Sequence, residues 1–297
     1  MKKILITGAA GFIGRQLSDY LDKKKIVTLD IDDLSVKPVL KPKKKLIKMK
    51  VEDITSAFLK KNSVEKIVHF AAKKSVDQSF YNFNNSIQNY EMTIKLLNSA
   101  VNSDVKNFYN ASTCEIFGYQ KNKLKENNKY IPHSPYAVSK VANEYLCNLY
   151  MMQKPKLKIT SLIFFNTYGP TEGRDAVIPK FIYALTKNKP INIEGKGDQA
   201  RDFTFIEDSI LALYKVIKSK KYFRYINIGS GKDVSINELS KILKNFFPKM
   251  KINNIKSRIN EIKTFRANTK ILKKEFKVKY KFSINKGIQK TIKFFNK

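Results

Sequence analysis

Cysteine and histidine are scarce in this chain, and no long hydrophobic run occurs in it. Among 297 residues there are two cysteines, Cys114 and Cys147, which cannot build a disulfide framework. We therefore expect a reducing, cytoplasmic environment. With only two histidines as well, no metal site is expected. No apolar run approaches the ~20 residues that a membrane span needs, and the N-terminal apolar stretch is too short and glycine-rich for a signal peptide.

Acidic residues and arginines are also few. There are 25 aspartates and glutamates against 58 lysines and arginines, which gives a formal net charge of +33. Only 6 of the basic residues are arginines, and the 52 lysines are spread along the whole length without aromatic interleaving. A general bias toward lysine explains this better than a dedicated binding face. We expect non-specific attraction to polyanions at low salt, and no specific nucleic-acid partner.

A short apolar strand at the N-terminus leads directly into three glycines and an amphipathic helical pattern. The glycines are Gly8, Gly11 and Gly14. In this arrangement one glycine makes a tight turn, one lets the backbone approach a pyrophosphate, and one lets the helix pack closely on the strand. The N–H groups at the start of the helix then hold the phosphates. Asp30, 22 residues after Gly8, ends the next apolar run, where a carboxylate would bind the ribose hydroxyls of adenosine.

Apolar runs alternate with helical patterns through the first 170 residues, which predicts a doubly wound parallel (Rossmann) sheet in an α/β fold. The expected strands are 3–7, 26–30, 46–51, 66–71, 105–111 and 158–165, and the expected helices are 12–23, 54–62, 86–103 and 134–153. Shorter elements follow a break at Gly169-Pro170: helices at 177–187, 207–218, 235–246 and 283–295, and strands at 191–193 and 225–228. We expect a cofactor-binding domain over 1–170, with 203–230 returning to it. Residues 171–202 and 231–297 would form a smaller, discontinuous substrate-binding lobe.

Tyr136 and Lys140 are four residues apart at the start of a predicted helix, so they share a helix face. A lysine beside a phenol favours the phenolate and can create a base. The spacing alone decides nothing, because six tyrosines have a lysine four residues later. Context favours Tyr136, since it follows the strand that ends in Ser112 and Thr113, and ligands meet doubly wound sheets at the carboxyl ends of strands. This arrangement suits removal of a proton from a sugar hydroxyl while hydride leaves.

The ordered series of motifs resembles the extended short-chain dehydrogenase/reductase family, specifically its NAD-dependent nucleotide-sugar epimerases and dehydratases. The resemblance covers nearly the whole chain, and the series of motifs is similar to that of UDP-glucose 4-epimerases. It rests on the segments Thr7–Gly14, Asp30, Asp53-Ile54, His69–Ala72, Asn89, Ser112-Thr113, Tyr136 with Lys140, Phe165–Pro170, Gly197–Phe203 and Asn227–Gly231.

The resemblance implies that NAD is the cofactor. Acidic residues after the second strand would repel the 2′-phosphate of NADP, which also favours NAD. The implied cofactor-binding residues are those of the glycine segment, Asp30 at the ribose, a pair flanking the adenine, and three residues lining the nicotinamide side. By residue these are Gly8, Gly11, Phe12, Ile13, Gly14, Asp30, then Asp53 and Ile54, then Ala71, Ala72 and Lys74, together with Asn89, Tyr136 and Lys140.

The same resemblance implies that Asn166, Arg201 and Arg258 clamp the diphosphate of the substrate, for which arginine is a suitable charge-assisted donor. Each residue also has a simpler interpretation. Asn166 could stabilise a turn, Arg201 could pair with Asp202, and Arg258 could be a solvated surface charge. His69 ends a strand and is interpreted as structural.

A nucleotide-sugar 4-epimerase is the favoured reaction, with Tyr136 as base, Lys140 lowering its pKa and Thr113 binding the reacting oxygen. The alternatives are a 4,6-dehydratase or UDP-glucuronate decarboxylase, in which Glu115 would remove the C5 proton, and then a 4-ketoreductase. A basic nucleic-acid-binding protein on a Rossmann scaffold is the alternative from another class.

The resemblance also implies a homodimer, formed through the helices at 86–103 and 134–153. Its apolar contacts would come from four leucines, unless these face their own sheet instead: Leu96, Leu97, Leu146 and Leu149.

Overall fold

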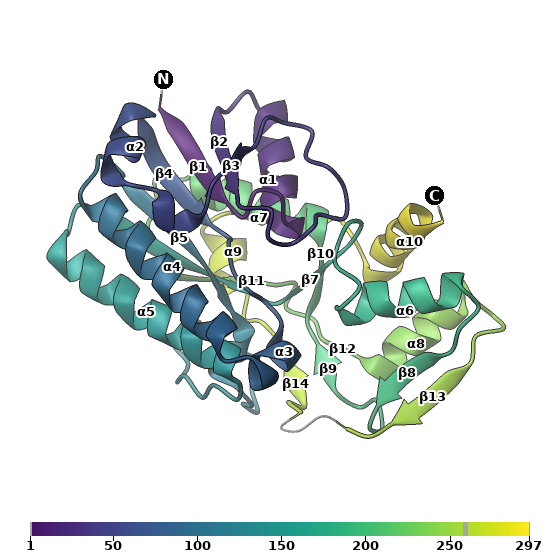
Figure 1. The fold of residues 1–297 in the computed structure, drawn as a ribbon. Helices are drawn as coiled ribbons and strands as arrows, with labels where there is room; N and C mark the ends of the chain where they lie inside the picture. Colours follow the sequence, from purple (N-terminus) through teal and green to yellow (C-terminus); the bar gives the residue numbers. More distant parts are fainter. Residues whose placement is uncertain (1, 258–260, 297) are drawn as a thin grey trace.

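The computed structural model describes residues 2–257 and 261–296, and a parallel sheet lies at its centre (Figure 1). Within these residues the sheet has seven strands in the order β11-β6-β5-β4-β1-β2-β3, and all neighbouring pairs are parallel. The strands are β1 (Lys3–Thr7), β2 (Thr28–Asp32), β3 (Ile47–Lys48), β4 (Val64–His69), β5 (Asn107–Thr113), β6 (Lys158–Phe164) and β11 (Tyr225–Ile228).

Helices cover both faces of this sheet (Figure 1). In β1, Ile4 and Ile6 pack into one hydrophobic core with α1 (Phe12–Lys23) and α7 (Ile206–Lys218). Leu5 points the other way, into a second core with α2 (Ser56–Lys61), α4 (Asn84–Val101) and α5 (Pro135–Gln153). Because successive strand residues alternate between faces, a strand buried on both sides reads as a continuous apolar run. The expected doubly wound sheet is confirmed.

A second group of elements lies beside the carboxyl ends of the strands of the central sheet (Figure 1). Two short strands, β7 (Asn166–Tyr168) and β10 (Phe203–Phe205), pair in parallel where the chain leaves the sheet. The remaining elements of this group are α6 (Val177–Thr186), β8 (Ile191–Glu194), β9 (Ala200–Arg201), β12 (Val234–Ser235), α8 (Ile236–Lys244), β13 (Ile252–Ile255), β14 (Thr264–Phe265) and α10 (Ile284–Phe295). Helix α9 (Lys270–Lys274) instead packs against β11 of the central sheet.

Several boundaries differ from those predicted. β2 runs to Asp32 rather than ending at residue 30, and β4 ends at His69 rather than at residue 71. The strand expected over 46–51 is short, because a 3₁₀ turn, η1 (Val51–Asp53), follows it. A six-residue helix, α3 (Val76–Tyr81), was not predicted, since so short an element has no hydrophobic periodicity to reveal it. Among the described residues, no helix is long and apolar enough to cross a membrane.

Candidate functional site

The three glycines form a tight cradle between β1 and α1. Gly8 has a φ of +66°, which favours glycine, and a Cβ there would lie 2.7 Å from the backbone nitrogen of Ala71. A Cβ on Gly14 would lie 2.2 Å from the carbonyl oxygen of Gly8. Helix α1 begins at Phe12 after Gly11, which provides no side-chain cap. An uncapped helix N-terminus against a turn of glycines and alanines fits the diphosphate of a dinucleotide.

The acidic residue beside this cradle is Asp32 rather than Asp30. Asp32 ends β2, and its carboxylate accepts hydrogen bonds from the N–H of Ala10 (3.0 Å) and of Leu34 (2.8 Å). Asp30 is buried, and its carboxylate accepts a hydrogen bond from the Ser18 hydroxyl of α1. Asp30 thus lies against the flanking helix α1. It is two residues before Asp32, at the strand end where a ribose would lie.

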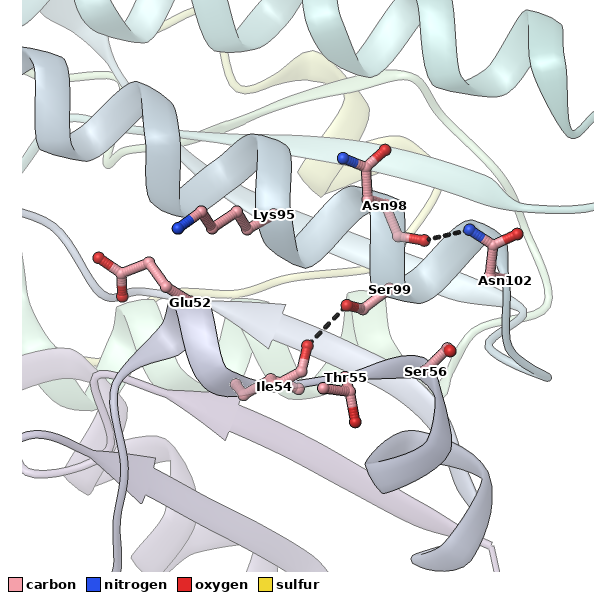
Figure 2. A pocket seen from close by; sticks show the side chains of 8 residues that line it. All are labelled: Glu52, Ile54, Thr55, Ser56, Lys95, Asn98, Ser99 and Asn102. Carbon is pink, nitrogen blue, oxygen red and sulfur yellow. Dashed lines mark hydrogen bonds between the residues drawn. The ribbon is translucent and has the colours of Figure 1, made fainter.

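The segment expected to flank the adenine leaves one side chain accessible. Asp53 is exposed at the end of η1, whereas the Ile54 side chain is 1% exposed and packs in the core. The Ile54 carbonyl accepts a hydrogen bond from the Ser99 hydroxyl at 2.6 Å. Figure 2 shows this contact at the wall of a polar hollow of about 310 Å³ between η1 and α4. The hollow is lined by Glu52, Ile54, Thr55, Ser56, Lys95, Asn98, Ser99 and Asn102, so it adjoins Asp53 but contains none of the expected catalytic residues.

The loop after β4 carries the residues expected on the nicotinamide side. Ala71 and Ala72 are half-buried, and Lys74 is exposed with its Nζ 3.7 Å from Asp175 Oδ2. Asn89 is 2% exposed and fixes this loop, because it accepts from the N–H of Lys73 (2.7 Å) and donates to the carbonyl of Lys73 (3.0 Å). The side chain of Asn89 therefore shapes the loop through its backbone.

His69 closes β4 beneath this loop. Its Nδ1 lies 2.7 Å from the Thr7 hydroxyl, and its Nε2 lies 3.4 Å from the hydroxyl of Thr93. Burial, together with the charge of Lys140, lowers the pKa of His69 to about 3. The ring is therefore neutral at physiological pH and joins β1, β4 and α4.

Tyr136, Lys140 and Thr113 come together at the carboxyl end of β5. Ser134 caps α5, with its hydroxyl accepting from the N–H of Ala137 (3.1 Å), so Tyr136 lies in the first turn. Thr113 ends β5, and both residues are about one-tenth exposed. Lys140 lies one turn further along α5, with its Nζ 5.9 Å from the centre of the Tyr136 ring.

The pKa values of Tyr136 and Lys140 do not follow the expectation that Lys140 lowers the pKa of Tyr136. The pKa of Tyr136 lies above its ordinary value, because burial and the nearby Glu115 and Cys114 raise it more than the Thr113 hydroxyl lowers it. The Nζ of Lys140 donates to the Ala111 carbonyl on β5 (2.8 Å), not to the phenol. Burial lowers the pKa of Lys140 to about 8. In this structure the lysine therefore does not by itself make the tyrosine a base at neutral pH.

Glu115 lines a smaller hollow, of about 50 Å³, next to the start of α5. It belongs to η2 (Cys114–Phe117), which continues directly from β5. Cys114 is buried, and burial raises the pKa of its thiol well above the ordinary value, which keeps it protonated. The hollow is lined by Val76, Asp77, Phe80, Glu115, His133, Ser134, Arg201, Glu261, Ile262 and Phe265.

Of the expected diphosphate clamps, Arg201 lines this hollow. Its guanidinium forms an ion pair with Glu261 and donates to the Ile262 carbonyl (2.8 Å). The alternative pairing with Asp202 is wrong, because the Asp202 carboxylate accepts from the N–H groups of Ser230, Gly231 and Ala267. Asn166 is half-buried in β7 and its N–H donates to the Asp202 carbonyl (3.1 Å), while Arg258 lies outside the described residues.

Sequence reasoning did not single out two acidic residues near these groups. Glu261 pairs with Arg201, which lies 60 residues away in the sequence, so no local pattern indicates this contact. Glu172 is buried in the loop after β7, and burial raises its pKa to about 8 despite the opposing charge of Lys74. Nothing local to the sequence indicates that burial, because the loop is covered by segments distant along the chain.

Comparisons with known proteins agree with this geometry. The NAD dependent epimerase/dehydratase family matches residues 4–229. An uncharacterized UDP-glucose epimerase of Bacillus subtilis, YtcB, is 33% identical over 79% of this chain and 78% of its own. The NAD-dependent NDP-hexosamine 5,6-dehydratase TunA of tunicamycin biosynthesis has a TM-score of 0.94 and 31% identity, over 99% of this chain and 97% of its own. UDP-glucuronic acid 4-epimerase from Bacillus cereus, solved with UDP-glucuronic acid and NAD, has a TM-score of 0.92 and 27% identity, over 99% of both chains.

These relatives confirm the resemblance to NAD-dependent enzymes of the extended short-chain dehydrogenase/reductase type, and the glycine cradle fits the cofactor that they use. The chain belongs to the NAD dependent epimerase/dehydratase family and is an NAD-dependent enzyme.

Proposed function

We propose that this enzyme is a nucleotide-sugar 4-epimerase of the UDP-hexose class that acts through a transient 4-keto intermediate. One observation carries the proposal. The side chains of Tyr136 and Thr113 interact at the carboxyl end of β5, with Lys140 one turn further along α5, while the glycine cradle lies at the end of β1 in the same sheet. A sugar hydroxyl between these groups would face both a proton acceptor and a hydride acceptor.

Each residue then has a definite role. Tyr136 accepts the proton of the sugar 4-hydroxyl, and Thr113 holds the reacting oxygen. NAD, when bound, would supply the acceptor for the C4 hydride and the donor that restores it. The positive charge of the oxidised nicotinamide would oppose the burial that raises the pKa of Tyr136. Lys140, anchored on the Ala111 carbonyl, adds its own charge at the end of β5.

The cofactor site is proposed to use the glycine segment and Asp32. Gly8, Gly11, Phe12, Ile13 and Gly14 would hold the diphosphate, and Asp53, Ala71, Ala72 and Lys74 would border the adenine and nicotinamide ends. Ile54 would contribute through its own backbone, which Ser99 holds, and Asn89 through the Lys73 backbone that it fixes. Asp32 replaces Asp30 as the ribose ligand, because it lies at the strand end against the cradle.

Asp32→Asn is expected to weaken NAD binding about tenfold or more, since a charge-assisted hydrogen bond to the ribose is lost. Asp30→Asn is the matched control, and its effect should fall on thermal stability through the contact with Ser18. NAD released from denatured protein, measured by mass spectrometry, and calorimetric titration of stripped protein would report both. Equal losses of NAD affinity in the two variants would contradict the assignment to Asp32.

The nucleotide sugar is proposed to bind between the two groups of elements. Residues 1–170 and 203–230 would form the cofactor domain, and 171–202 with 231–297 the substrate lobe. Arg201 would bind the diphosphate with Asn166 and Arg258. The pairing of Arg201 with Glu261 shows that this guanidinium already binds an anionic group, for which a phosphate oxygen is a natural replacement.

The purified protein, incubated with a panel of nucleotide sugars and no added cofactor, should convert one of them to its 4-epimer. NMR would identify the product. In deuterated water the product should carry no deuterium at carbon, because the original hydride returns. Carbon-bound deuterium would contradict epimerisation. RNA that co-purifies at high salt in place of NAD would instead favour a nucleic-acid-binding protein.

A dehydratase is the second candidate, and one observation favours it. Glu115 lies close enough to Tyr136 to raise the pKa of the phenol, so a carboxylate is present where a C5 proton would be removed. TunA, a dehydratase, is similar over nearly the full chain.

Glu115→Gln separates these two reactions. A 4-epimerase should keep activity within about tenfold, since only hydride and the 4-hydroxyl proton move. A dehydratase should lose product formation while C4 oxidation, followed as NADH absorbance, persists. Glu65→Gln, which removes a half-buried carboxylate paired with Lys2 and Lys106, is the matched control and should leave either reaction unchanged.

We also propose a cytoplasmic homodimer. Both cysteines are buried free thiols, which supports a reducing compartment. Leu96 and Leu97 are fully buried and face their own sheet, so they cannot form the dimer contact. Helix α5 instead exposes an apolar stripe that includes Val138, Tyr145, Leu149 and Met152.

Leu149→Arg is expected to convert the dimer to a monomer, because it places a charge in the centre of this stripe. Val39→Arg changes a comparably exposed apolar residue elsewhere and should leave the dimer intact. Light scattering at micromolar concentration would measure both masses. A monomeric wild-type protein would contradict the proposed assembly.

A further inference from the structure

Helix α5 carries three ionisable side chains spaced by four residues on one buried face. They are Tyr136, Lys140 and Glu144. Glu144 is 0% exposed and Lys140 is 5% exposed, so the two charges lie side by side, one helical turn apart and away from water. A carboxylate is rarely buried so completely without a compensating charge.

Glu144 is held in place by groups from two other segments. Its Oε2 accepts from the Ser161 hydroxyl of β6 (2.5 Å) and from Nη2 of Arg224 (3.2 Å). Arg224 is fixed in turn, since it also donates to Ser161 Oγ (2.7 Å), to Asn148 Oδ1 (2.8 Å) and to the Glu144 carbonyl (3.0 Å). Arg224 and Ser161 therefore orient one oxygen of the carboxylate.

The other oxygen, Glu144 Oε1, is buried and has no hydrogen-bond partner among the described residues. Its remaining negative potential acts on its surroundings in a low-dielectric site, where charges interact strongly. Lys140 needs such a potential. Burial lowers the pKa of Lys140 to about 8, and the charge of Glu144 is the largest influence that opposes this loss.

We propose that Glu144, oriented by Arg224 and Ser161, is a positioning residue that keeps Lys140 positively charged. It acts through Lys140 and does not touch the substrate. The proposal rests on the proposed roles of Tyr136 and Lys140 in catalysis.

The consequence is a dependence of the reaction on pH. Lys140 supports proton removal by Tyr136 only while it is protonated, so activity is lost as the pH rises through the pKa of Lys140. Removing the negative charge of Glu144 lowers that pKa and moves the alkaline limb to lower pH. The ionisable groups that face Lys140 or surround Glu144 are Tyr136, Glu144 and Cys147 of α5, His69 of β4, Arg224, and the two tyrosines Tyr130 and Tyr225.

Glu144→Gln in the NAD-bound enzyme is the central test. Glutamine keeps the shape and can accept the bonds from Ser161 and Arg224 through its amide oxygen. We expect the alkaline midpoint of the profile of kcat/KM against pH to fall by about one pH unit, so that activity above pH 8 drops about tenfold more than activity at pH 6.5. The substrate is the nucleotide sugar that the panel identifies.

Asn148→Ala is the matched control, because it removes a ligand of Arg224 without changing any charge. It should lower thermal stability and leave the alkaline midpoint in place. Glu144→Asp keeps the charge and should retain most of the wild-type profile. An Asn148→Ala midpoint that falls as far as that of Glu144→Gln would overturn the proposal, as would a Glu144→Gln loss that is equal at every pH.

Arg224→Met gives an independent result if Glu144→Gln does not fold. Removing Arg224 leaves the buried Glu144 carboxylate without its compensating charge, which favours the neutral carboxyl and weakens its support of Lys140. The alkaline midpoint should therefore fall, and a midpoint that rises or stays in place would overturn the proposal. Tyr136→Phe separates this question from the reaction itself. An active Tyr136→Phe variant would contradict the proposed function. If Tyr136→Phe is inactive but the Glu144 and Arg224 variants keep the wild-type alkaline midpoint, only the role of Glu144 is contradicted.

Discussion

Tyr136→Phe should retain NAD and lose turnover by about 10²- to 10⁴-fold. The change removes the proton acceptor from the end of β5 and leaves the ring, which is buried and packs in the first turn of α5. Because the cofactor cradle is built from the backbone of other segments, NAD content should stay near that of the wild type. Mass spectrometry of the bound cofactor and turnover of the panel-selected nucleotide sugar would measure the two effects separately.

Tyr150→Phe is the matched control. Tyr150 also has a lysine four residues later on α5, but its hydroxyl donates to Asn98 Oδ1 (2.6 Å), and Lys154 Nζ donates to the Ser103 carbonyl (2.8 Å). Neither group lies at the carboxyl end of a strand. This variant should keep activity within about twofold. Comparable losses in both variants would show that the position of Tyr136 at the strand end does not decide its role.

The central sheet was predictable because its strands are buried on both faces and therefore appear as apolar runs. Helix α1 and strands β1 and β11 have the predicted bounds. The end of β2 was misplaced, because the acidic residues Asp30 and Asp32 alternate with Ile31 and interrupt the apolar run before the strand ends. A carboxylate on a strand is read as a boundary, although here Ser18 accommodates it.

The contacts that complete the site were less accessible to sequence reasoning. Glu261 reaches Arg201 across about 60 residues of chain, and no local pattern specifies such a pair. The spacing of Tyr136 and Lys140 correctly placed both on one helix face. It did not show that Lys140 donates to the Ala111 carbonyl, because that contact depends on how α5 packs against β5. Helix periodicity determines a face, while the partner on that face is determined by tertiary packing.

Gly14→Ala is expected to have a large effect on both stability and NAD binding. Helix propensity alone predicts that Gly14→Ala stabilises α1 by about 1 kcal/mol. The structure predicts the opposite. The added Cβ would lie 2.2 Å from the Gly8 carbonyl oxygen and 3.1 Å from the Ala9 Cα, and both contacts are to backbone. The turn must therefore move, at a cost of about 1–3 kcal/mol in the free energy of unfolding.

The movement would spread to the cofactor site, because Gly8 has no room to retreat. A Cβ at Gly8 would already lie 2.7 Å from the Ala71 nitrogen, so that residue packs directly against the loop after β4. We expect Gly14→Ala to lose NAD during purification and to melt at a lower temperature. Gly173→Ala is the control, since its nearest contact would be the mobile carboxylate end of Asp175, and it should change neither quantity appreciably. If Gly14→Ala retained NAD as well as Gly173→Ala does, the glycine turn would not be the rigid cradle that the cofactor requires.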